Sequence, residues 1–331
     1  MTKLNTVWYQ DRVILWPFLP LSQIYSICVR LRRLFYEKRD RLFKAKTSIP
    51  IIVVGNITVG GTGKTPLVIY IAELLQQQGF KPGLLSRGYK GSHREPTQVN
   101  AKSDPKCVGD EPVLLVKRLQ CPMVVGRNRL AALENLRQNF SVDVVISDDG
   151  LQHYPLPRHI EIAVIDGERR FGNGYCLPVG PLREPKSRLK EVDFIVANGG
   201  IKEAGEYQME CTASFVYNAC HPENPITLEA FKSKQGEKVH AVAGLGNPNR
   251  FFQLLESFGL SVIQHVFPDH YPFSDKDIIF ADNLPVILTE KDAVKCMGFM
   301  GSLHWVLPIG VKINPLFDTK LLNRLKELCN G

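Results

Sequence analysis

From Ile49 onward, short apolar runs alternate with amphipathic segments along the chain. The run IPIIVVG precedes a predicted helix over 64–78, and KPGLLS is followed, after a polar loop, by a predicted helix around 111–119. The alternation continues through PMVVG, a predicted helix over 127–139, VDVVISDD and IEIAVID. Short buried strands separated by helices predict a doubly wound, mainly parallel α/β/α sheet. Ligands of such sheets bind at the carboxyl ends of the strands.

A second, smaller alternation begins after about Asn198, with KVHAVAG, a predicted helix over 249–258, LSVIQHVF, a predicted helix after Ser274, PVILTE and HWVLPI. MECTASFVYNA, at 209–219, predicts an extended connector between the two units. We therefore expect three regions. They are an N-terminal region over 1–47, a core domain over 48–200, and linker strands with a smaller α/β domain over 201–331.

The composition indicates an ordinary globular protein with an anionic partner. The chain has 331 residues, 44% of them hydrophobic and 22% charged, and it has eight cysteines without a CxxC pair. This pattern argues against a disulfide framework and a zinc site, and it favours reduced thiols in the cytoplasm. A formal charge of +8 is compatible with nucleic acid, a nucleotide or an acidic membrane face.

The N-terminal region combines an apolar segment with a basic one. VILWPFLPLSQIYSICV, at 13–29, contains two prolines and three polar residues, so it is too short and interrupted to span a bilayer. The following stretch, 30–46, carries eight basic residues against two acidic ones. Aromatic and apolar side chains beside a basic helix suit an interfacial membrane anchor. A helix packed on its own domain is the alternative, and this segment alone does not decide between them.

GNITVGGTGKTP, at 55–66, follows a predicted strand and opens a predicted helix. Backbone N–H groups at such a turn surround phosphate oxygens, with the lysine reaching the β and γ phosphates and the next threonine ligating Mg²⁺. Thr58 stands where the usual phosphate loop has its first glycine. Partition-type ATPases share the glycine pair but have a lysine where Val59 stands, which counts against an ATPase switch. The predicted loop comprises Thr58, Val59, Gly60, Gly61, Thr62, Gly63, Lys64 and Thr65.

Acidic residues stand where such a loop needs them. Asp148 and Asp149 end the predicted strand VDVVISDD, at the edge where the loop should lie, and are candidate metal-side ligands. Asp110 and Glu111 begin a predicted helix in CVGDEPVLL. Acids at this position can be simple N-terminal caps. A kinase acting on a hydroxyl also needs a carboxylate near the nucleophile, so Asp110 is the candidate base.

Three arginines lie in loops that follow predicted strands: Arg87 in SRGYKG, Arg127 in GRNR and Arg183 in LPVGPLREP. Guanidinium groups clamp phosphates, so these loops indicate a second phosphate beyond those of the nucleotide. His270, in FPDHYPFSDKD, would be structural if considered alone. It could assist Asp110 if the two domains face each other. The charges of TEKDAVK, at 289–295, predict a solvated helix start.

Taken together, these motifs resemble the tetraacyldisaccharide 4'-kinase family, the lipid A 4'-kinases. The resemblance rests on GNITVGGTGKTP, LLSRGYKG, VGDEP, GRNR, DDGLQH, LPVGPLREP, FPDHYPF and TEKDAVK, in that order. It implies a P-loop kinase with two α/β/α domains and a two-stranded linker. It also implies Mg-ATP as donor, transfer to the 4'-hydroxyl of the tetraacyl disaccharide 1-phosphate, and lipid IVA as product.

The resemblance also implies roles for individual residues. Lys64 and Thr65 would bind ATP and Mg²⁺, and Asp110 with His270 would activate the sugar hydroxyl. Glu111, Asp148 and Asp149 would organise the metal. Arg87, Arg127 and Arg183 would hold phosphates of substrate or nucleotide.

We expect a peripheral enzyme at the cytoplasmic face of the inner membrane, because a lipid acceptor with four acyl chains stays in the bilayer. The expected partners are the lipid A disaccharide precursor and the membrane surface, with neither nucleic acid nor an obligate protein partner. Two other hypotheses remain open. One is a membrane-recruited ATPase switch without a lipid acceptor, and the other is a soluble kinase of a small cofactor precursor.

Overall fold

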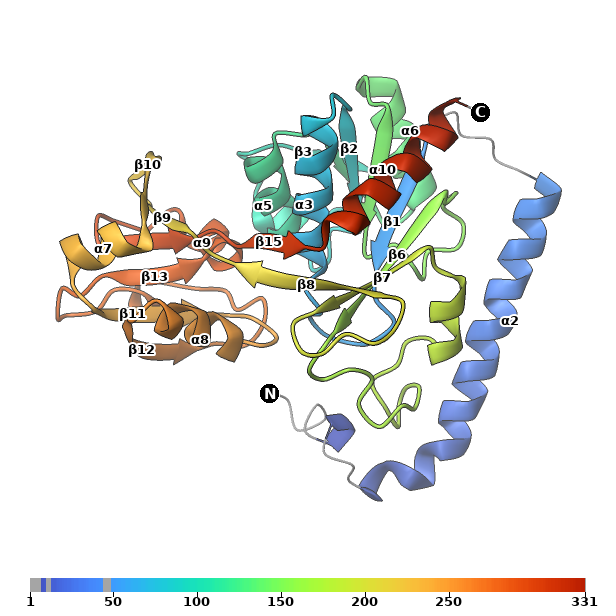
Figure 1. The fold of residues 1–331 in the computed structure, drawn as a ribbon, viewed down its shortest axis with the longest axis horizontal. Helices are drawn as coiled ribbons and strands as arrows, with labels where there is room; N and C mark the ends of the chain where they lie inside the picture. The colour runs from blue at the N-terminus through green and yellow to red at the C-terminus, as the bar shows by residue number, and fades with distance from the viewer. Residues whose placement is uncertain (1–6, 10–12, 44–48, 331) are drawn as a thin grey trace.

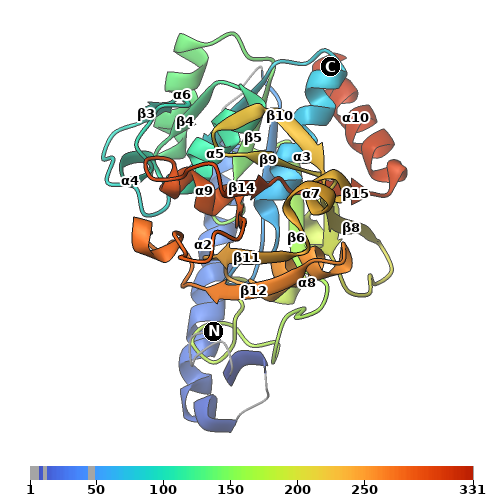
Figure 2. The same ribbon diagram turned by 90° about the vertical axis from the view of Figure 1, so that its left-hand side faces the viewer.

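Two β-sheets, each covered by helices, lie side by side in the computed structural model (Figure 1). The structure describes residues 7–9, 13–43 and 49–330, without the side chains of 13, 14, 39–43 and 330. Part of the predicted N-terminal region, including Lys44 and Lys46, therefore lies outside the described residues. Figure 2 looks onto the smaller sheet from the left-hand side of Figure 1.

The larger sheet has nine strands, and only its two edge strands run antiparallel to their neighbours. Its centre is β1, in which Ile51, Ile52, Val53 and Val54 are all fully buried. Strands buried on both faces read as continuous apolar runs, which is why IPIIVV predicts a central strand. The doubly wound α/β fold is confirmed. In sheet order the strands are β15 (Gly310–Ile313), β8 (Glu206–Thr212), β7 (Phe194–Asn198), β6 (Ile160–Asp166), β1 (Ile51–Gly55), β5 (Val144–Asp148), β2 (Pro82–Ser86), β4 (Met123–Val125) and β3 (Thr97–Val99).

Helices cover both faces of this sheet. One face packs against α3 (Lys64–Gln77), α5 (Asp110–Leu119) and α10 (Pro315–Asn330). The opposite face packs against α6 (Arg129–Asn139), near the short helix η2 (Lys186–Glu191). The four-residue α4 (Pro105–Val108) immediately precedes α5. This arrangement leaves the carboxyl ends of β1 and β5 open to the loops that carry the candidate site.

The smaller sheet has six strands, of which β14, β13, β11 and β12 are parallel, as the alternating pattern predicts. The helix expected after Ser274 is only a short 3-10 turn, η3 (Asp275–Asp277). The helices of the smaller sheet's unit are α7 (Leu228–Gln235), α8 (Asn249–Ser257) and α9 (Glu290–Cys296). In sheet order the strands are β10 (His221–Thr227), β9 (Phe215–Asn218), β14 (His304–Leu307), β13 (Val286–Thr289), β11 (Lys238–Ala243) and β12 (Ser261–Val266).

Two chain segments join the sheets. The first runs from β8 into β9, so the extended segment predicted over 209–219 consists of strands that belong to both sheets. The second runs from β14 into β15 and returns the chain to the larger sheet, where β15 pairs with β8 in antiparallel register. The last helix, α10, then packs its Phe317, Leu321 and Leu325 into the larger core. The domain division after residue 200 stays a prediction.

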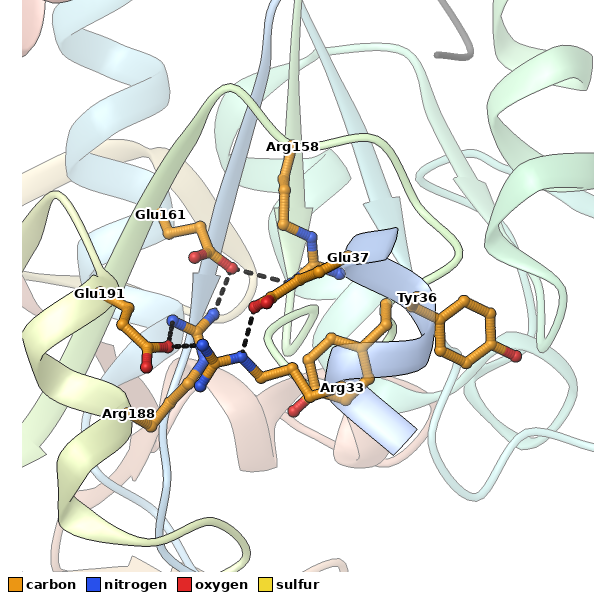
Figure 3. A pocket seen from close by; sticks show the side chains of 8 residues that line it. Arg33, Tyr36, Glu37, Arg158, Glu161, Arg188 and Glu191 are labelled. Carbon is orange, nitrogen blue, oxygen red and sulfur yellow. Dashed lines mark hydrogen bonds and ion pairs between the residues drawn. The ribbon is translucent and has the colours of Figure 1, made fainter. Parts of the chain in front are cut away.

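Helix α2 (Leu19–Phe43) lies along the larger sheet's unit, on the side away from the smaller sheet (Figure 1). Its docked face is polar. Arg33 pairs with Glu37 at 2.7 Å and also with Glu191, which in turn lies 3.7 Å from buried Arg188. Arg188 also pairs with Glu161 at 2.5 Å, so ion pairs join the helix to the core (Figure 3).

The face of the N-terminal segment that points away from the core is apolar. Exposed fractions of its large hydrophobic side chains range from 47% to 64%. None of the described helices is long and apolar enough to cross a bilayer. Exposed apolar side chains gathered on one segment mark an interaction surface. The exposed side chains, here called the α2 apolar face, lie on the short 3-10 helix η1 (Val13–Phe18), which leads into α2, and on α2 itself: Trp16, Phe18, Leu21, Ile24, Ile27, Leu31, Leu34 and Phe35.

Phe317 tests whether the returning C-terminal helix completes the larger core. Its side chain is fully buried and contacts the rings of Phe194 and Tyr207 at centroid distances of 5.4 Å. We expect Phe317→Ala to lower the free energy of unfolding by about 3–5 kcal/mol, measured by urea titration. Leu316→Ala is the matched control, since Leu316 is 51% exposed and should cost little. Equal losses from the two variants would contradict the packing described.

Candidate active site

The loop between β1 and α3 is shaped by glycines and held from outside. Gly60 and Gly63 have φ of 103° and 91°, a region in which side chains are strained. A Cβ at Gly63 would clash with the amide nitrogen of Asn198, whose side chain donates to the Thr62 carbonyl at 3.0 Å. Any larger residue at 63 would therefore push Asn198 off the loop.

The loop's other tethers leave a row of amides open. The Val59 N–H donates to the Pro181 carbonyl at 2.8 Å, and Thr58 bridges to Leu182. Arg169 donates to the Gly61 carbonyl at 2.6 Å. In the part of the chain that the structure describes, the N–H groups of residues 60–63 donate to no acceptor. Successive free amides before a helix N-terminus form an anion-binding concavity.

Lys64 and Arg183 converge on Asp149. The Lys64 Nζ lies 3.4 Å from the carboxylate and the Arg183 guanidinium 3.1 Å from it. Burial would raise the pKa of Asp149, but the charges of Lys64 and Arg183 outweigh it and lower the pKa to about 2. Asp149 is therefore ionised at neutral pH and fixes both cations beside the loop.

Asp148 is in the opposite situation. Its side chain is buried at the end of β5, and its Oδ1 has no hydrogen-bond partner among the described residues. Burial, and after it the charge of the nearby Glu111 carboxylate, raise the pKa of Asp148 to about 7 against the attraction of Lys64. An orphaned carboxylate oxygen at this position needs a proton or a cation.

Asp110 and His270 meet across the two sheets. The His270 Nδ1 lies 2.8 Å from one carboxylate oxygen of Asp110 and 3.0 Å from the other. Both side chains are largely buried. Burial would raise the pKa of Asp110, but its hydrogen bond with His270 and the charge of Lys291 lower it below the usual value. The smaller unit thus already places its histidine on the predicted base.

The histidine is held by its backbone and by a neighbouring ring. His270 has φ of 61°, in the left-handed region that few non-glycine residues adopt. The ring of Tyr89 lies 5.5 Å from the His270 ring, centroid to centroid. Strained backbone that surrounding contacts maintain is typical of functional sites.

Lys291 crosses between the units at the same place. Its Nζ lies 2.9 Å from Glu111, 3.0 Å from Asp269 and 3.5 Å from the Nε2 of His270. The expectation that TEKDAVK is a solvated helix start is therefore wrong. Asp292 of this segment is fully buried, where it accepts hydrogen bonds from Thr289 and from the Gly244 N–H. The segment instead joins the two units and supports the histidine loop.

The arginines separate into different environments. Arg183 contacts Asp149 beside the phosphate loop, as described above. Arg87 and Arg127 are exposed, and no carboxylate of the described residues pairs with either. Arg129, the second arginine of GRNR, is buried and donates to the Asp148 carbonyl at 2.9 Å, while its Nη1 has no partner among the described residues.

Sequence reasoning also missed two supporting residues. Asn198 ends β7 next to the loop, and Gln152 donates to the Asn56 carbonyl at 2.9 Å and to Glu184 at 2.7 Å. Gln152 was within the motif DDGLQH, but nothing in a single sequence indicates which polar side chain points back to the loop. The end of β7 was detectable only by its apolar run FIVAN.

The donors around Asp148 fit a hard divalent cation. Asp148, Asp149 and Glu111 offer carboxylate oxygens, which are ligands that Mg²⁺ prefers, and Thr65 carries a hydroxyl directly after Lys64 at the start of α3. The described residues contain no cluster of three acidic, histidine or cysteine side chains placed to hold a metal by themselves. Mg²⁺ usually takes one or two carboxylates together with phosphate oxygens and water, so this open set suits it.

Comparison with known proteins gives one consistent family. A family model described as Tetraacyldisaccharide-1-P 4'-kinase matches residues 14–326. A curated tetraacyldisaccharide 4'-kinase of Nitrosococcus oceani is 47% identical over 97% of this chain and 93% of its own length. One of Methylobacillus flagellatus is 49% identical over 93% of this chain and 91% of its own length.

A solved structure agrees with the sequence matches. It is the "apo" form of LpxK from Aquifex aeolicus in complex with ATP. It superposes with a TM-score of 0.79 at 28% sequence identity, covering 95% of this chain and 99% of its own. The likeness therefore extends over both sheets and the N-terminal helix region.

The opposite pKa shifts of the two neighbouring aspartates predict opposite effects on stability. Because the pKa of Asp148 is raised in the fold, ionising its carboxyl group lowers the free energy of unfolding. The loss grows as the pH rises from about 4 to about 7 and stays constant above that range. Without nucleotide or Mg²⁺, Asp148→Asn should therefore raise Tm at pH 8, by about 2–4 °C if it recovers 1 kcal/mol. The gain should vanish below about pH 4.

Asp149→Asn is the matched control. Because the pKa of Asp149 is lowered in the fold, its ionised carboxylate stabilises the fold at pH values above about 4, and this stabilisation is lost as the pH falls to about 2. The substitution should lower Tm at pH 8, though modestly, since the Asp149 side chain is 36% exposed and solvent screens its ion pairs. Thermal unfolding followed by circular dichroism measures both variants. Shifts of the same sign at pH 8 would contradict the two environments.

Proposed function

This chain belongs to the tetraacyldisaccharide 4'-kinase family, and from that premise we propose which of its residues carry out the reaction. The protein is a kinase of lipid A biosynthesis that uses ATP to phosphorylate the 4'-hydroxyl of tetraacyldisaccharide 1-phosphate, giving lipid IVA. The observation that carries the residue assignment is the contact of Asp110 with His270, next to Glu111, whose charge acts on Asp148.

The ATP triphosphate lies on the loop from Thr58 to Thr65. The open amides of residues 60–63 hold its oxygens, and Lys64 reaches the β and γ phosphates. The Val59 N–H, already bonded to Pro181, keeps the loop in shape rather than touching phosphate. Lys64 must then turn from Asp149, which lies 3.4 Å away, towards the incoming phosphate.

Thr65, Asp148, Asp149 and Glu111 are the residues that would hold Mg²⁺ or its waters. The unpartnered Oδ1 of Asp148 supports this assignment, because a bound cation would compensate its charge. When bound, Mg²⁺ supplies neutralisation of the charge on the phosphate oxygens. Lys291, which lies 2.9 Å from Glu111, balances that carboxylate from the other unit.

Asp110 acts as the general base. Its lowered pKa keeps it ionised, so it accepts the proton of the 4'-hydroxyl as that oxygen attacks the γ-phosphorus and ADP leaves. His270 positions the carboxylate through its Nδ1, at 2.8 Å. Lys291 and Asp269 in turn hold the histidine loop.

The arginines divide between the two phosphate-bearing molecules. Arg183 is on the nucleotide side, because its guanidinium contacts Asp149 next to Lys64. Arg87 and Arg127 are exposed and lack a carboxylate partner within the described chain, so they are free to clamp the 1-phosphate of the acceptor. Buried Arg129 differs from both, because it donates to the Asp148 carbonyl at 2.9 Å.

The protein works as a peripheral enzyme at the cytoplasmic face of the inner membrane. The α2 apolar face supports this location, since its eight exposed side chains would enter the interface while the polar face of α2 stays docked on the core. The acceptor's acyl chains remain in the same bilayer. The proposed N-terminal region over 1–47 thus acts as the interfacial anchor.

Acceptor phosphorylation by the purified protein is the direct test. With Mg²⁺ and detergent micelles, we expect transfer of ³²P from ATP to the disaccharide acceptor. Asp110→Ala should lower turnover by about 10²–10⁴-fold, the usual contribution of a general base, while the Kd for ATP stays nearly unchanged. Asp104→Ala is a suitable control, because Asp104 is a simple N-terminal cap of the neighbouring α4.

Two outcomes would redirect the assignment. Strongly weakened ATP binding in Asp110→Ala would place that residue with the metal or the fold. Partner-stimulated ATP hydrolysis with no acceptor phosphorylation would instead favour the membrane-recruited switch.

Membrane attachment through α2 is tested by reducing its apolar face. The triple change Ile27→Ser, Leu31→Ser and Leu34→Ser should weaken binding to vesicles at least tenfold, since burying each side chain is worth about 1.5–3 kcal/mol. Exposed apolar residues elsewhere, Ile201→Ser with Val266→Ser, are the control. Vesicle co-sedimentation that is equal for both proteins would place the membrane contact elsewhere.

A further inference from the structure

A pocket of about 360 Å³ lies between α2 and the loop over 174–187. One wall is a stripe of α2 at four-residue spacing, Ser22, Ser26 and Arg30, and the other includes Lys186 and Ser187. Ligand pockets typically measure about 300–1,000 Å³, so this one accommodates a small polar group rather than a whole lipid. It is separate from the residues assigned to catalysis.

The walls of this pocket are fixed to each other. The Ser22 hydroxyl donates to the Cys176 carbonyl at 2.7 Å, and the Tyr25 hydroxyl to the Arg183 carbonyl at 3.1 Å. The Trp8 indole N–H donates to the Pro178 carbonyl at 3.0 Å. Three side chains of the N-terminal segment thus hold the loop in place, and the pocket between them is preformed.

The pocket carries two positive charges that no carboxylate neutralises. Within the described residues, neither Arg30 nor Lys186 has an acidic partner within 4.0 Å, although Lys186 lies 4.9 Å from the centre of the Phe171 ring. A neighbouring pocket of about 100 Å³ differs, because there Arg33 and Arg188 are paired with Glu37, Glu161 and Glu191 (Figure 3). Only the larger pocket therefore attracts an anion.

The position of Arg30 around the helix axis shows where a ligand of this pocket would lie relative to the α2 apolar face. At about 100° per residue, the docked side chains Ser22, Ser26 and Arg33 lie on one side of α2, and the α2 apolar face lies on the other. Arg30 falls between them, about 40° from Ser26 and from Leu34. An anion in the pocket therefore lies at the boundary between the core and the apolar surface.

We propose that this pocket binds the phosphate of an anionic phospholipid of the bilayer, through Arg30, Lys186 and the hydroxyls of Ser26 and Ser187. This inference rests on the proposed attachment of α2 to the membrane, and it names the lipid class that the attachment recognises. With the α2 apolar face among acyl chains, the headgroup of a neighbouring lipid is at the level of the pocket. A zwitterionic lipid lacks the net charge that two unpaired cations favour.

Binding there would also set the position of the active site over the membrane. The loop that forms one wall contains Arg183, whose guanidinium contacts Asp149 beside the phosphate loop. Lys186, which would hold the phospholipid, is therefore three residues along the chain from Arg183, a residue of the proposed nucleotide site. A bound phospholipid would in this way fix the orientation of the enzyme towards its lipid acceptor.

The test compares vesicles of phosphatidylcholine alone with vesicles that also contain phosphatidylglycerol, at equal total lipid. We expect the wild-type protein to prefer the anionic vesicles, and Arg30→Gln with Lys186→Gln to lose at least about tenfold in binding to them. Lys234→Gln with Lys326→Gln removes the same net charge from exposed sites elsewhere and should lose less than about threefold. Thermal stability should be unchanged in both.

Three outcomes separate the inference from its premise. Wild-type protein that binds neither vesicle overturns the membrane attachment and this site with it. Equal losses in the two double variants leave the attachment standing and overturn the site, since only net charge would then matter. A raised KM for the acceptor in neutral detergent, confined to the Arg30 and Lys186 variant, also overturns it, because the pocket would then hold the acceptor's own phosphate.

Discussion

The site depends on one contact between the two sheets, in which His270 and Lys291 of the smaller unit meet Asp110 and Glu111 at the start of α5. These pairs are mostly shielded from solvent, so each charge relies on its partner more than an exposed ion pair would. The link from β8 to β9 and the return from β14 to β15 hold the two sheets at the distance this contact needs. In the proposed mechanism, the smaller unit therefore supplies the groups that orient the base, Asp110.

Much of this arrangement was predictable, because the chemistry of the phosphate loop is local. A strand, a glycine turn and a helix in 51–77 specify their own geometry, and two acids at the end of β5 must meet that loop in a parallel sheet. The choice between Arg127 and Arg129 was not predictable, since both lie in GRNR and only packing decides which is buried. Lys291 was missed for a related reason. Its charged neighbours are typical of a solvated helix, and only contacts with a distant segment bury them.

The returning end of the chain shows a different limit of sequence reasoning. Residues 310–330 follow the smaller unit in sequence, yet β15 and α10 complete the larger core. Apolar spacing predicts that a helix such as α10 is amphipathic, but it carries no information about which sheet it covers. The two chain segments that join the sheets, β8 to β9 and β14 to β15, resist separation of the units, because β8 and β15 are hydrogen-bonded to each other. Motion of the smaller unit must therefore bend this pair of strands as one element.

The N-terminal helix reverses the usual relation between a helix and its core. A packing helix buries its apolar stripe, whereas α2 docks through Arg33, Ser22 and Tyr25 and leaves its apolar stripe open. The docking is specific because buried Arg188 and Glu161 need partners of defined geometry (Figure 3). The loop held by Ser22 and Tyr25 also contains Arg183, which leads directly to Asp149 and Lys64. The helix with the open apolar face is thus joined, through one loop and without passing through the smaller sheet, to the two residues proposed to act at the nucleotide site, Asp149 and Lys64.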